Sequence, residues 1–260
     1  MIGRTISTLI LLLVVTVSGI WFFSKTPTTT RIAEPAIEAL IVGTNAEYPP
    51  FSFIEKDQIV GFDIDVITEL AKRLKKSVTL TNMSFEALIP ELQLGSIHMI
   101  AGGITPTPER EKRALFTLPH LEDDALMAVQ KAGAQPITHA ADLTHKVVVV
   151  NQGYSSDHYV SDIETSEVVR ISSPLVSTGL LTLDSGQADV YIASKNALQP
   201  FLAQKSEHYV VTPLEGTGES YALAISKKYP QLHSQIQSTL SAMIKDGTVA
   251  QLQKKWKLND

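Results

Sequence analysis

The chain has 260 residues, of which 44% are hydrophobic, 19% are charged and none is cysteine. This balance is typical of a globular protein and excludes a disordered chain or a polytopic membrane protein. Without cysteine there are no disulfides, thiol nucleophiles or Cys-ligated zinc sites. The formal net charge of −5 argues against a nucleic-acid-binding surface.

The amino terminus has the pattern of an export signal. Arg4 precedes an apolar run over residues 9–23, so residues 1–24 are predicted to be a signal peptide, with an uncleaved signal anchor as the alternative. Residues 25–39, rich in Thr, Pro and Ala, are predicted to be a linker. The working part is therefore expected in the periplasm or elsewhere outside the cytoplasm, where ATP and NAD are not supplied, and no cofactor is expected. Because a lipid-modified cysteine is impossible, membrane attachment would need an uncleaved segment 9–23.

Short apolar runs alternate with helical patterns from residue 39 to residue 101. Strands are predicted at 39–42, 78–80 and 97–101. A first helix is predicted from the apolar face formed by Phe62, Val66, Ile67, Leu70 and Leu74. A second helix is predicted over 86–94, with Gly95 as the residue that ends it.

A second series of the same kind follows. The β-branched run 147–150 is typical of a buried parallel strand, and residues 180–192 repeat the order helix, glycine, strand seen over 89–101. Residues 229–257 are predicted to be helical with a break at Gly247. Strands alternating with helices indicate an α/β protein with parallel sheets and crossover helices, and the internal echo is what two similar lobes would give.

Ligands of open α/β sheets bind beyond the carboxyl ends of the strands, so the residues after each strand are the candidates for a site. After the first strand, Tyr48 can offer its ring to a ligand, although Tyr48 and Phe51 can also simply cap the core. Glu47 is either an exposed turn carboxylate or an acceptor for a basic group. After the third strand, Gly102 and Gly103 permit a close approach to the backbone.

Arg110 stands out because it lies in the first turn of a short helix predicted to begin with Thr107 as N-cap and Pro108 at the first helical position. A cation there is unfavourably placed against the helix dipole, which suggests a bound anion such as a carboxylate. A surface arginine paired with Glu109 or Glu111 is the alternative.

The segment after residues 147–150 offers a second grip on an anion through its backbone N–H groups and Ser155. No catalytic motif is found, the seven histidines are scattered, and no pair of acidic residues suggests a general acid and base. A binding protein without metal is therefore favoured over an enzyme.

Several segments in order resemble one protein family. VGTNAEYPPFSF at 42–53, VGFDIDV at 60–66, FEALIP at 85–90, ITPTPER at 104–110 and KDGTVAQLQKKW at 245–256 resemble the bacterial extracellular solute-binding proteins of family 3. These are receptors for polar amino acids that work with ABC importers, and the similarity is greatest to the branch that binds arginine and glutamine. The resemblance covers about residues 40–256.

The resemblance implies a two-lobed α/β Venus-flytrap fold of the periplasmic binding protein type 2, with a hinge and with the ligand between the lobes. Lobe 1 is expected over residues 40–123 and 220–260 and lobe 2 over 124–219, with hinge strands near 123–127 and 218–223. The expected partners are a polar amino acid, arginine or glutamine, and the permease subunits of an ABC importer; the receptor is expected to be a monomer.

The resemblance also implies roles for single residues. Tyr48 and Phe85 match positions that sandwich the ligand side chain, Gly103 and Thr105 match positions that touch its α-groups, and Arg110 matches the clamp of the α-carboxylate. Ser155 matches the residue of the second lobe that closes on that carboxylate. The residues expected to contact the ligand are Asn45, Glu47, Tyr48, Phe85, Gly102, Gly103, Thr105, Arg110, Gln152, Ser155 and Ser194.

One position departs from the family pattern. Where the family usually has an aspartate that binds the α-ammonium group, this chain has Ser194 followed by Lys195. A hydroxyl cannot neutralise a buried cation. Either Glu47 or Glu219 substitutes, or affinity is weak, or the ligand is not a standard α-amino acid.

Two rival functions stay open on the sequence. A periplasmic lyase or dehydratase of the same fold would need an acid or base such as Glu47 or His98 in the cleft. A sensory or surface-exposed binding domain would use the fold without transport.

Overall fold

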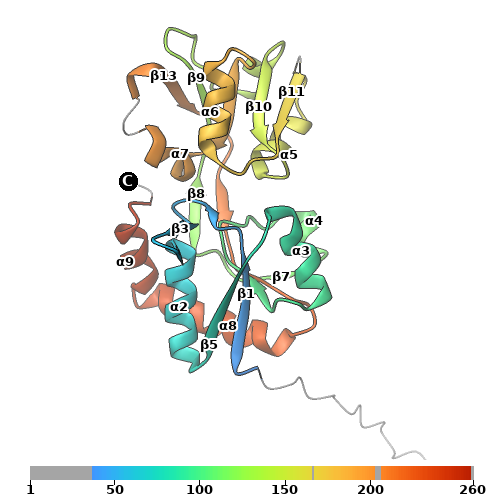
Figure 1. Cartoon of the computed structure of the whole chain (residues 1–260), viewed down its shortest axis with the longest axis vertical. Helices are drawn as coiled ribbons and strands as arrows, with labels where there is room; N and C mark the ends of the chain where they lie inside the picture. Colours follow the sequence, from blue (N-terminus) through green and yellow to red (C-terminus); the bar gives the residue numbers. More distant parts are fainter. Residues whose placement is uncertain (1–36, 166, 203–205, 259–260) are drawn as a thin grey trace, which may run out of the picture. The chain divides into compact units, whose positions relative to one another are not determined.

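The computed structural model of the chain describes residues 37–165, 167–202 and 206–258 (Figure 1). The fold is two-lobed α/β, as predicted, with one five-stranded sheet in each lobe. The predicted signal segment and residues 25–36 of the predicted linker lie outside the described residues. No helix within the described ranges is both long and apolar enough to cross a membrane.

The sheet of lobe 1 is mixed. Its strand order is β5-β1-β6-β15-β7, with β1 parallel to β5 and β6 and with β15 antiparallel to β6 and β7. Its strands are β1 (Ala39–Thr44), β5 (Ser77–Asn82), β6 (Met99–Ile100), β7 (Leu115–Phe116) and β15 (Ala224–Ile225). The helices of this lobe are α2 (Phe62–Leu74), α3 (Phe85–Leu94), α4 (Pro108–Glu111), α8 (Pro230–Lys245) and α9 (Thr248–Lys255).

Alternating side chains of β1 bury both faces of this sheet. Leu40 and Val42 belong to the core cluster that includes the apolar faces of α2 and α8, whereas Ile41 packs against the cluster that contains α3. This is the two-residue period of a strand covered by helices on both sides. The predicted helix over 62–74 is confirmed, and Gly95 ends α3 with a left-handed backbone, at φ 82°.

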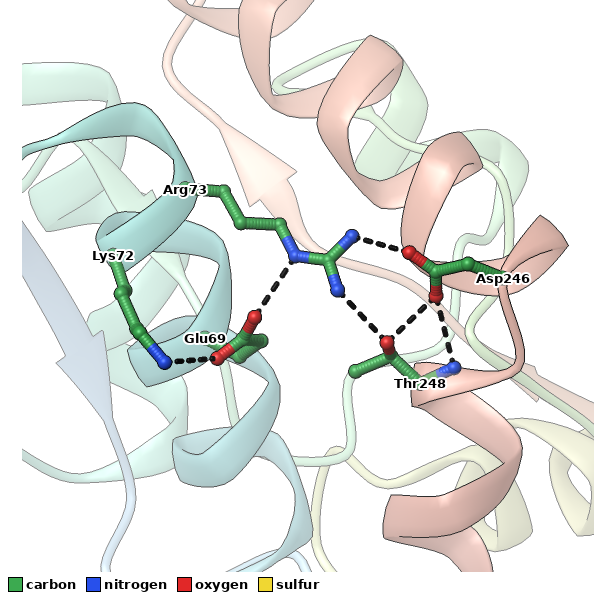
Figure 2. Close-up of polar contacts among 5 residues, drawn as sticks. All are labelled: Glu69, Lys72, Arg73, Asp246 and Thr248. Carbon is green, nitrogen blue, oxygen red and sulfur yellow. Dashed lines mark hydrogen bonds and ion pairs between the residues drawn. The ribbon is translucent and has the colours of Figure 1, made fainter.

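The carboxy-terminal helices are joined to α2 by polar contacts on the surface (Figure 2). Arg73 Nη1 lies 2.6 Å from Asp246 Oδ2, Arg73 Nη2 donates to Thr248 Oγ1 at 2.8 Å, and Arg73 Nε donates to Glu69 Oε1 at 2.9 Å. Asp246 and Thr248 flank Gly247, where the helical pattern breaks as predicted. The cluster therefore fixes the bend between α8 and α9 against α2.

The sheet of lobe 2 repeats the arrangement, with the order β11-β10-β12-β9-β13. Strand β10 is parallel to both β11 and β12, whereas β9 is antiparallel to β12 and β13. Its strands are β9 (Leu126–Lys131), β10 (Val147–Asn151), β11 (Glu167–Ile171), β12 (Val190–Ser194) and β13 (Tyr209–Pro213). Its helices are η1 (Ala140–Leu143), α5 (Ser155–Ser161), α6 (Val176–Asp184), α7 (Lys195–Leu202) and η2 (Ser206–His208).

The expectation of parallel sheets is wrong for one strand of each sheet, β15 in lobe 1 and β9 in lobe 2. The chain passes from β8 (Leu121–Asp124) into β9 without a crossover helix, and the start of β9 at Leu126 pairs with the end of β12 at Ser194. Likewise, β14 (Glu219–Tyr221) leads into β15, whose Ala224 pairs with Ile100 at the end of β6. A strand that enters a sheet at the edge where its neighbour ends must run in the opposite direction.

Two small sheets complete the fold. Strands β8 and β14 pair with each other, in the segments where the hinge is predicted, and Asp123 there has a positive φ of 62°. Strands β2 (Glu47–Tyr48), β3 (Ser52–Glu55) and β4 (Gln58–Val60) form a meander after β1. The predicted lobe boundaries, residues 40–123 with 220–260 and residues 124–219, stay a prediction, as does the hinge.

Candidate functional site

Tyr48 links the two lobes at the carboxyl ends of their sheets. Its ring stacks on Phe51 at 5.2 Å, and its hydroxyl lies 2.8 Å from Ser194 Oγ at the end of β12. Phe51 is fully buried and packs against Tyr221, so the interpretation of Phe51 as a core residue holds. The Tyr48 ring is largely buried, and its only polar atom is committed to Ser194.

The turn after β6 is held by a buried carboxylate. Asp63, in the first turn of α2, accepts hydrogen bonds from the N–H groups of Gly102 and Gly103 at 2.7 and 2.8 Å, and His120 lies 2.8 Å from its other oxygen. Gly103 has φ 68°, and a Cβ atom there would lie 2.7 Å from the Tyr48 ring. These glycines allow a tight turn under Tyr48, and their N–H groups are engaged by Asp63.

Arg110 is buried at the contact between the lobes. Thr107 Oγ1 accepts from Arg110 N at 3.2 Å, which confirms the predicted N-cap. The guanidinium donates to Thr105 O at 2.9 Å and, from the other lobe, to Gly153 O at 3.1 Å, and it lies 5.2 Å from the centre of the Phe85 ring. Only 9% of Arg110 is exposed, so the alternative of a surface arginine paired with Glu109 or Glu111 is wrong.

The charge of Arg110 is balanced by no close anion in the described part of the chain. Both of its hydrogen-bond acceptors are neutral carbonyl oxygens, and no described carboxylate lies within ion-pair distance. Burial lowers the pKa of the guanidinium, and the charge of Glu219 opposes that shift. Since arginine stays protonated in proteins, the site holds a buried positive charge.

A turn after β10 brings the second lobe to the same place. Gly153 N donates to Asp157 Oδ2 at 2.9 Å, and Asp157 is in turn held by Arg170 at 2.7 Å. Gln152 N donates to Ile171 O, so neither N–H group is free for an anion. The expectation of a backbone grip is therefore wrong for these two amides, because the turn needs both for its own shape.

Tyr154 in this turn was not anticipated as a site residue. The centre of its ring lies 5.4 Å from that of Tyr48 and 4.7 Å from that of Phe85, so Tyr154 contacts both of the lobe 1 aromatic residues that were predicted to bind the ligand. Its buried hydroxyl has no hydrogen-bond partner in the described structure. Burial raises the pKa of this hydroxyl, with further contributions from Glu86 and Glu47.

Glu219 is a buried carboxylate between the lobes. It is 7% exposed, and its oxygens lie 3.4 Å from Thr105 Oγ1 of lobe 1 and 3.2 Å from the Tyr221 hydroxyl. Ser155 of lobe 2 also donates a hydrogen bond to it. Burial raises the pKa of Glu219 to about 7 against the opposing effect of Ser155, and Asp124 adds to the increase.

A cavity of about 170 Å³ lies between the lobes beside Tyr154. Asn45 is buried next to it, with Nδ2 donating to Met83 O at 3.2 Å and with an Oδ1 atom that has no partner in the described structure. Glu47 and Glu86, which are both exposed residues, border the cavity. The cavity is lined by Asn45, Glu47, Ser84, Phe85, Glu86, Asn151, Gln152, Tyr154, Ile171, Ser172, Ser173 and Pro174.

The structure thus places the eleven predicted site residues in one region where the lobes meet. Asn45, Glu47, Phe85 and Gln152 border the cavity, while the other seven lie in the contacts around Tyr48, Arg110 and Glu219. His98 does not belong to this region, because its Nδ1 accepts from Ile41 N within the sheet. Over the described ranges, no three His, Asp or Glu side chains gather in a way that could hold a metal ion.

Fold and site together define a two-lobed protein with a charged, aromatic-lined contact region between its lobes. The family described as bacterial extracellular solute-binding proteins, family 3, matches residues 40–259. The chain belongs to this family, whose members work outside the cytoplasm.

Individual relatives agree with this assignment. The ABC transporter arginine-binding protein 1 of Escherichia coli K12 is 28% identical over 85% of this chain and 91% of its own length. The L-arginine-binding protein of Pseudomonas aeruginosa PAO1 is 31% identical over 83% and 86%. Among solved structures, an ancestral arginine-binding protein bound to arginine has a TM-score of 0.75 and 31% identity over 84% of this chain and 98% of the other. An ancestral arginine-binding protein bound to glutamine has a TM-score of 0.74 and 30% identity over 85% of this chain and 98% of the other.

Both curated relatives are named as arginine-binding proteins, one of them of an ABC transporter, and neither is named as an enzyme. The chain is accordingly a solute-binding protein and not an enzyme, in agreement with the expectation from its sequence.

Proposed function

We propose that the protein captures a polar amino acid between its lobes, with arginine preferred over glutamine, and delivers it to the permease of an ABC importer. The observation that carries this proposal is the buried Arg110, which has two neutral acceptors and no close carboxylate among the described residues. The names of the relatives, which bind arginine or serve ABC transporters, support the same class of ligand.

Arg110 is proposed to clamp the α-carboxylate. A guanidinium matches the two oxygens of a carboxylate, and such a charge-assisted pair is stronger than the bonds to Thr105 O and Gly153 O that it would replace. Since Gly153 belongs to the other lobe, the incoming carboxylate would take over a contact between lobes. Ser155 in the next turn remains the candidate for closing on the ligand from lobe 2.

The cavity beside Tyr154 is proposed to take the side chain. Two carboxylates, Glu47 and Glu86, and the unpartnered Asn45 Oδ1 give this cavity acceptors and negative charge. A guanidinium supplies donors and positive charge, whereas the amide of glutamine supplies donors and an acceptor but no charge. The aromatic rings of Phe85 and Tyr154 add apolar faces for the methylene groups of the ligand.

Calorimetry on protein that has been unfolded and refolded to remove carried-over solute tests this function. We expect L-arginine to bind with micromolar or tighter affinity. Glutamine and citrulline, the uncharged analogue of arginine, should bind more weakly by about tenfold or more. Glu47→Gln should reduce the preference for arginine over citrulline, while Glu55→Gln, an exposed carboxylate on β3 that does not line the cavity, should leave it unchanged. Equal affinity for arginine and citrulline would refute the assignment of this cavity to a cationic side chain, and no binding of any amino acid would refute the function.

The receptor is further proposed to act as a monomer outside the cytoplasmic membrane, exported by residues 1–24, and held there if segment 9–23 is not cleaved. Closure of the lobes about β8 and β14 would bury the ligand and create the surface that the permease recognises. Fractionation of cells that produce the full chain, compared with a chain lacking residues 1–24, tests export; size-exclusion chromatography tests the monomer.

A further inference from the structure

Two buried groups of opposite charge flank one residue, Thr105. Its backbone oxygen accepts from Arg110 Nη1 at 2.9 Å, and its hydroxyl lies 3.4 Å from Glu219 Oε1. Arg110 and Glu219 are 9% and 7% exposed and do not form an ion pair with each other. A guanidinium and a carboxyl group, unpaired with each other, are thus held by the same residue.

This spacing has a chemical counterpart in a free α-amino acid. Its carboxylate and its ammonium group are attached to the same carbon atom, so a receptor for the zwitterion needs one cation and one anion close together but unpaired. Burial of the ammonium without a carboxylate would carry a large desolvation cost. The pair around Thr105 meets both requirements.

Glu219 is reached from both lobes. It lies on β14, which pairs with β8 and belongs to neither five-stranded sheet, and its carboxylate contacts Thr105 of lobe 1 and Ser155 of lobe 2. A ligand group on this carboxylate would therefore meet side chains of both lobes at once. Such a group would be bound most tightly when the lobes are together.

The other polar groups nearby are less suited to a cation. Ser194 is uncharged and its Oγ lies against the Tyr48 hydroxyl at 2.8 Å. Asp124 accepts from Asn196 N at 3.0 Å, lies 3.0 Å from the Tyr221 hydroxyl, and has the positive charge of Lys195 near it. Glu47 is exposed and borders the cavity instead. Glu219 has only hydroxyl partners among the contacts described.

We propose that Glu219 is the acceptor of the ligand's α-ammonium group, opposite the carboxylate clamp at Arg110; this rests on the proposed amino-acid-binding function. Ser194 then supports the ring of Tyr48 rather than the ligand's charge. The charged and titratable groups that face Glu219 are Asp124, Arg110, Tyr48 and Tyr221. Burial raises the pKa of Glu219 to about 7, which an adjacent ammonium would lower again.

The test pairs two variants with two ligands that differ in one group. L-Arginine and 5-guanidinopentanoate share the carboxylate and the guanidinium, but only arginine has the α-ammonium. For Glu219→Gln we expect affinity for arginine to fall by about 30-fold or more, and affinity for 5-guanidinopentanoate to stay within about threefold of the parent. Glu47→Gln, the matched carboxylate of the cavity, should weaken both ligands by similar factors. Glu219→Asp, which keeps the charge, should recover part of the lost affinity for arginine.

Each result decides the assignment. Equal losses of both ligands in Glu219→Gln would mean that the residue only shapes the site, and unchanged binding of arginine would also overturn the proposal. A parent protein that binds no amino acid would instead refute the proposed function itself. If glutamine is the tighter ligand, L-glutamine and 4-carbamoylbutanoate serve as the pair with the same criteria. Thermal unfolding of each variant separates loss of binding from loss of fold.

Discussion

Arg73 and Arg110 are the same residue type in opposite surroundings. Arg73 lies on the surface of α2, and its three donor nitrogens contact Glu69, Asp246 and Thr248 (Figure 2). Arg110 is buried between the lobes and donates to two backbone carbonyls. The pKa of Arg73 is raised, chiefly by hydrogen bonds to Glu69 and Asp246, whereas burial lowers the pKa of Arg110.

The difference separates an arginine that serves the fold from one that remains available to a ligand. Around Arg73 the chain itself supplies the anions, so an added carboxylate would gain little. Burial has already removed the Arg110 guanidinium from water, and its two neutral acceptors offset only part of the free-energy cost of that desolvation. A carboxylate arriving there would meet a cation whose partners are weak and replaceable.

The strongest way to break this comparison is to remove the buried guanidinium. Arg110→Ala should weaken binding of L-arginine by about 3 kcal/mol, or roughly 150-fold in Kd, because a charge-assisted pair with the α-carboxylate is lost. Arg110→Lys should fall between parent and alanine, since an ammonium lacks the planar fork. Calorimetry at one salt concentration measures all three proteins.

Arg113→Ala is the matched control. Arg113 lies one turn further on, is partly exposed, and contacts Gln93 and Glu109 rather than the inter-lobe region. Its removal should change Kd by less than about twofold. Binding by Arg110→Ala as tight as that of the parent would show that the clamp is elsewhere.

The pH dependence of folding stability tests the buried carboxyl group, Glu219, that accompanies Arg110 between the lobes. The pKa of Glu219 rises from an ordinary 4.5 to about 7 in the folded protein, so the native state keeps a proton that the unfolded chain loses. The resulting stability is present below about pH 4.5 and is lost as the pH rises through about 7, by about 1.4 kcal/mol per pH unit between these values. Glu219→Gln, which cannot titrate, should lack this component.

Denaturant unfolding of the ligand-free parent and of Glu219→Gln, at about pH 5 and about pH 7, measures this contribution of Glu219 to the free energy of unfolding. The other groups that titrate in this range, such as His98, are common to both proteins and cancel in the difference. The free energy of unfolding should fall more steeply for the parent than for the variant. Parallel profiles would mean that Glu219 is ionised in the folded protein throughout.

Local signals made most of the fold predictable. The apolar face of α2, the left-handed Gly95 after α3, and the Thr107–Pro108 start of α4 each depend on a few neighbouring residues. The direction of β9 and β15 was not predictable in this way. The chain enters the two sheets from β8 and β14, and this sets the direction of β9 and β15. The pairing of β8 with β14 joins segments about 97 residues apart, so it has no local signal in the sequence.

The site residues likewise divide into those that a local motif predicts and those that depend on contacts between distant segments. Tyr48, Phe85 and Arg110 lie in motifs that resemble the family, and Glu219 could be named only as one of two substitutes for the missing aspartate. Tyr154 was missed, because its role depends on rings contributed by two segments of the other lobe. Gly102 and Gly103 were expected to permit a close approach of the ligand to the backbone, and the sequence did not reveal that Asp63 of α2 accepts hydrogen bonds from both of their N–H groups.

The smallest expected effect comes from the surface arginine. Arg73→Ala should lower Tm by less than about 3 °C and leave Kd for arginine unchanged, because exposed ion pairs are weak and the cluster is remote from the site contacts. The pKa of Asp246 is lowered to about 2, by Thr248 and then Arg73, so any stabilisation by this carboxylate is lost as the pH falls through about 2. Asp246→Asn should reproduce the change in Tm, and the difference from the parent should shrink in about 1 M salt. A loss of binding in Arg73→Ala comparable to that in Arg110→Ala would show that the α2–α8–α9 contact also controls the site, and the distinction between the two arginines would fail.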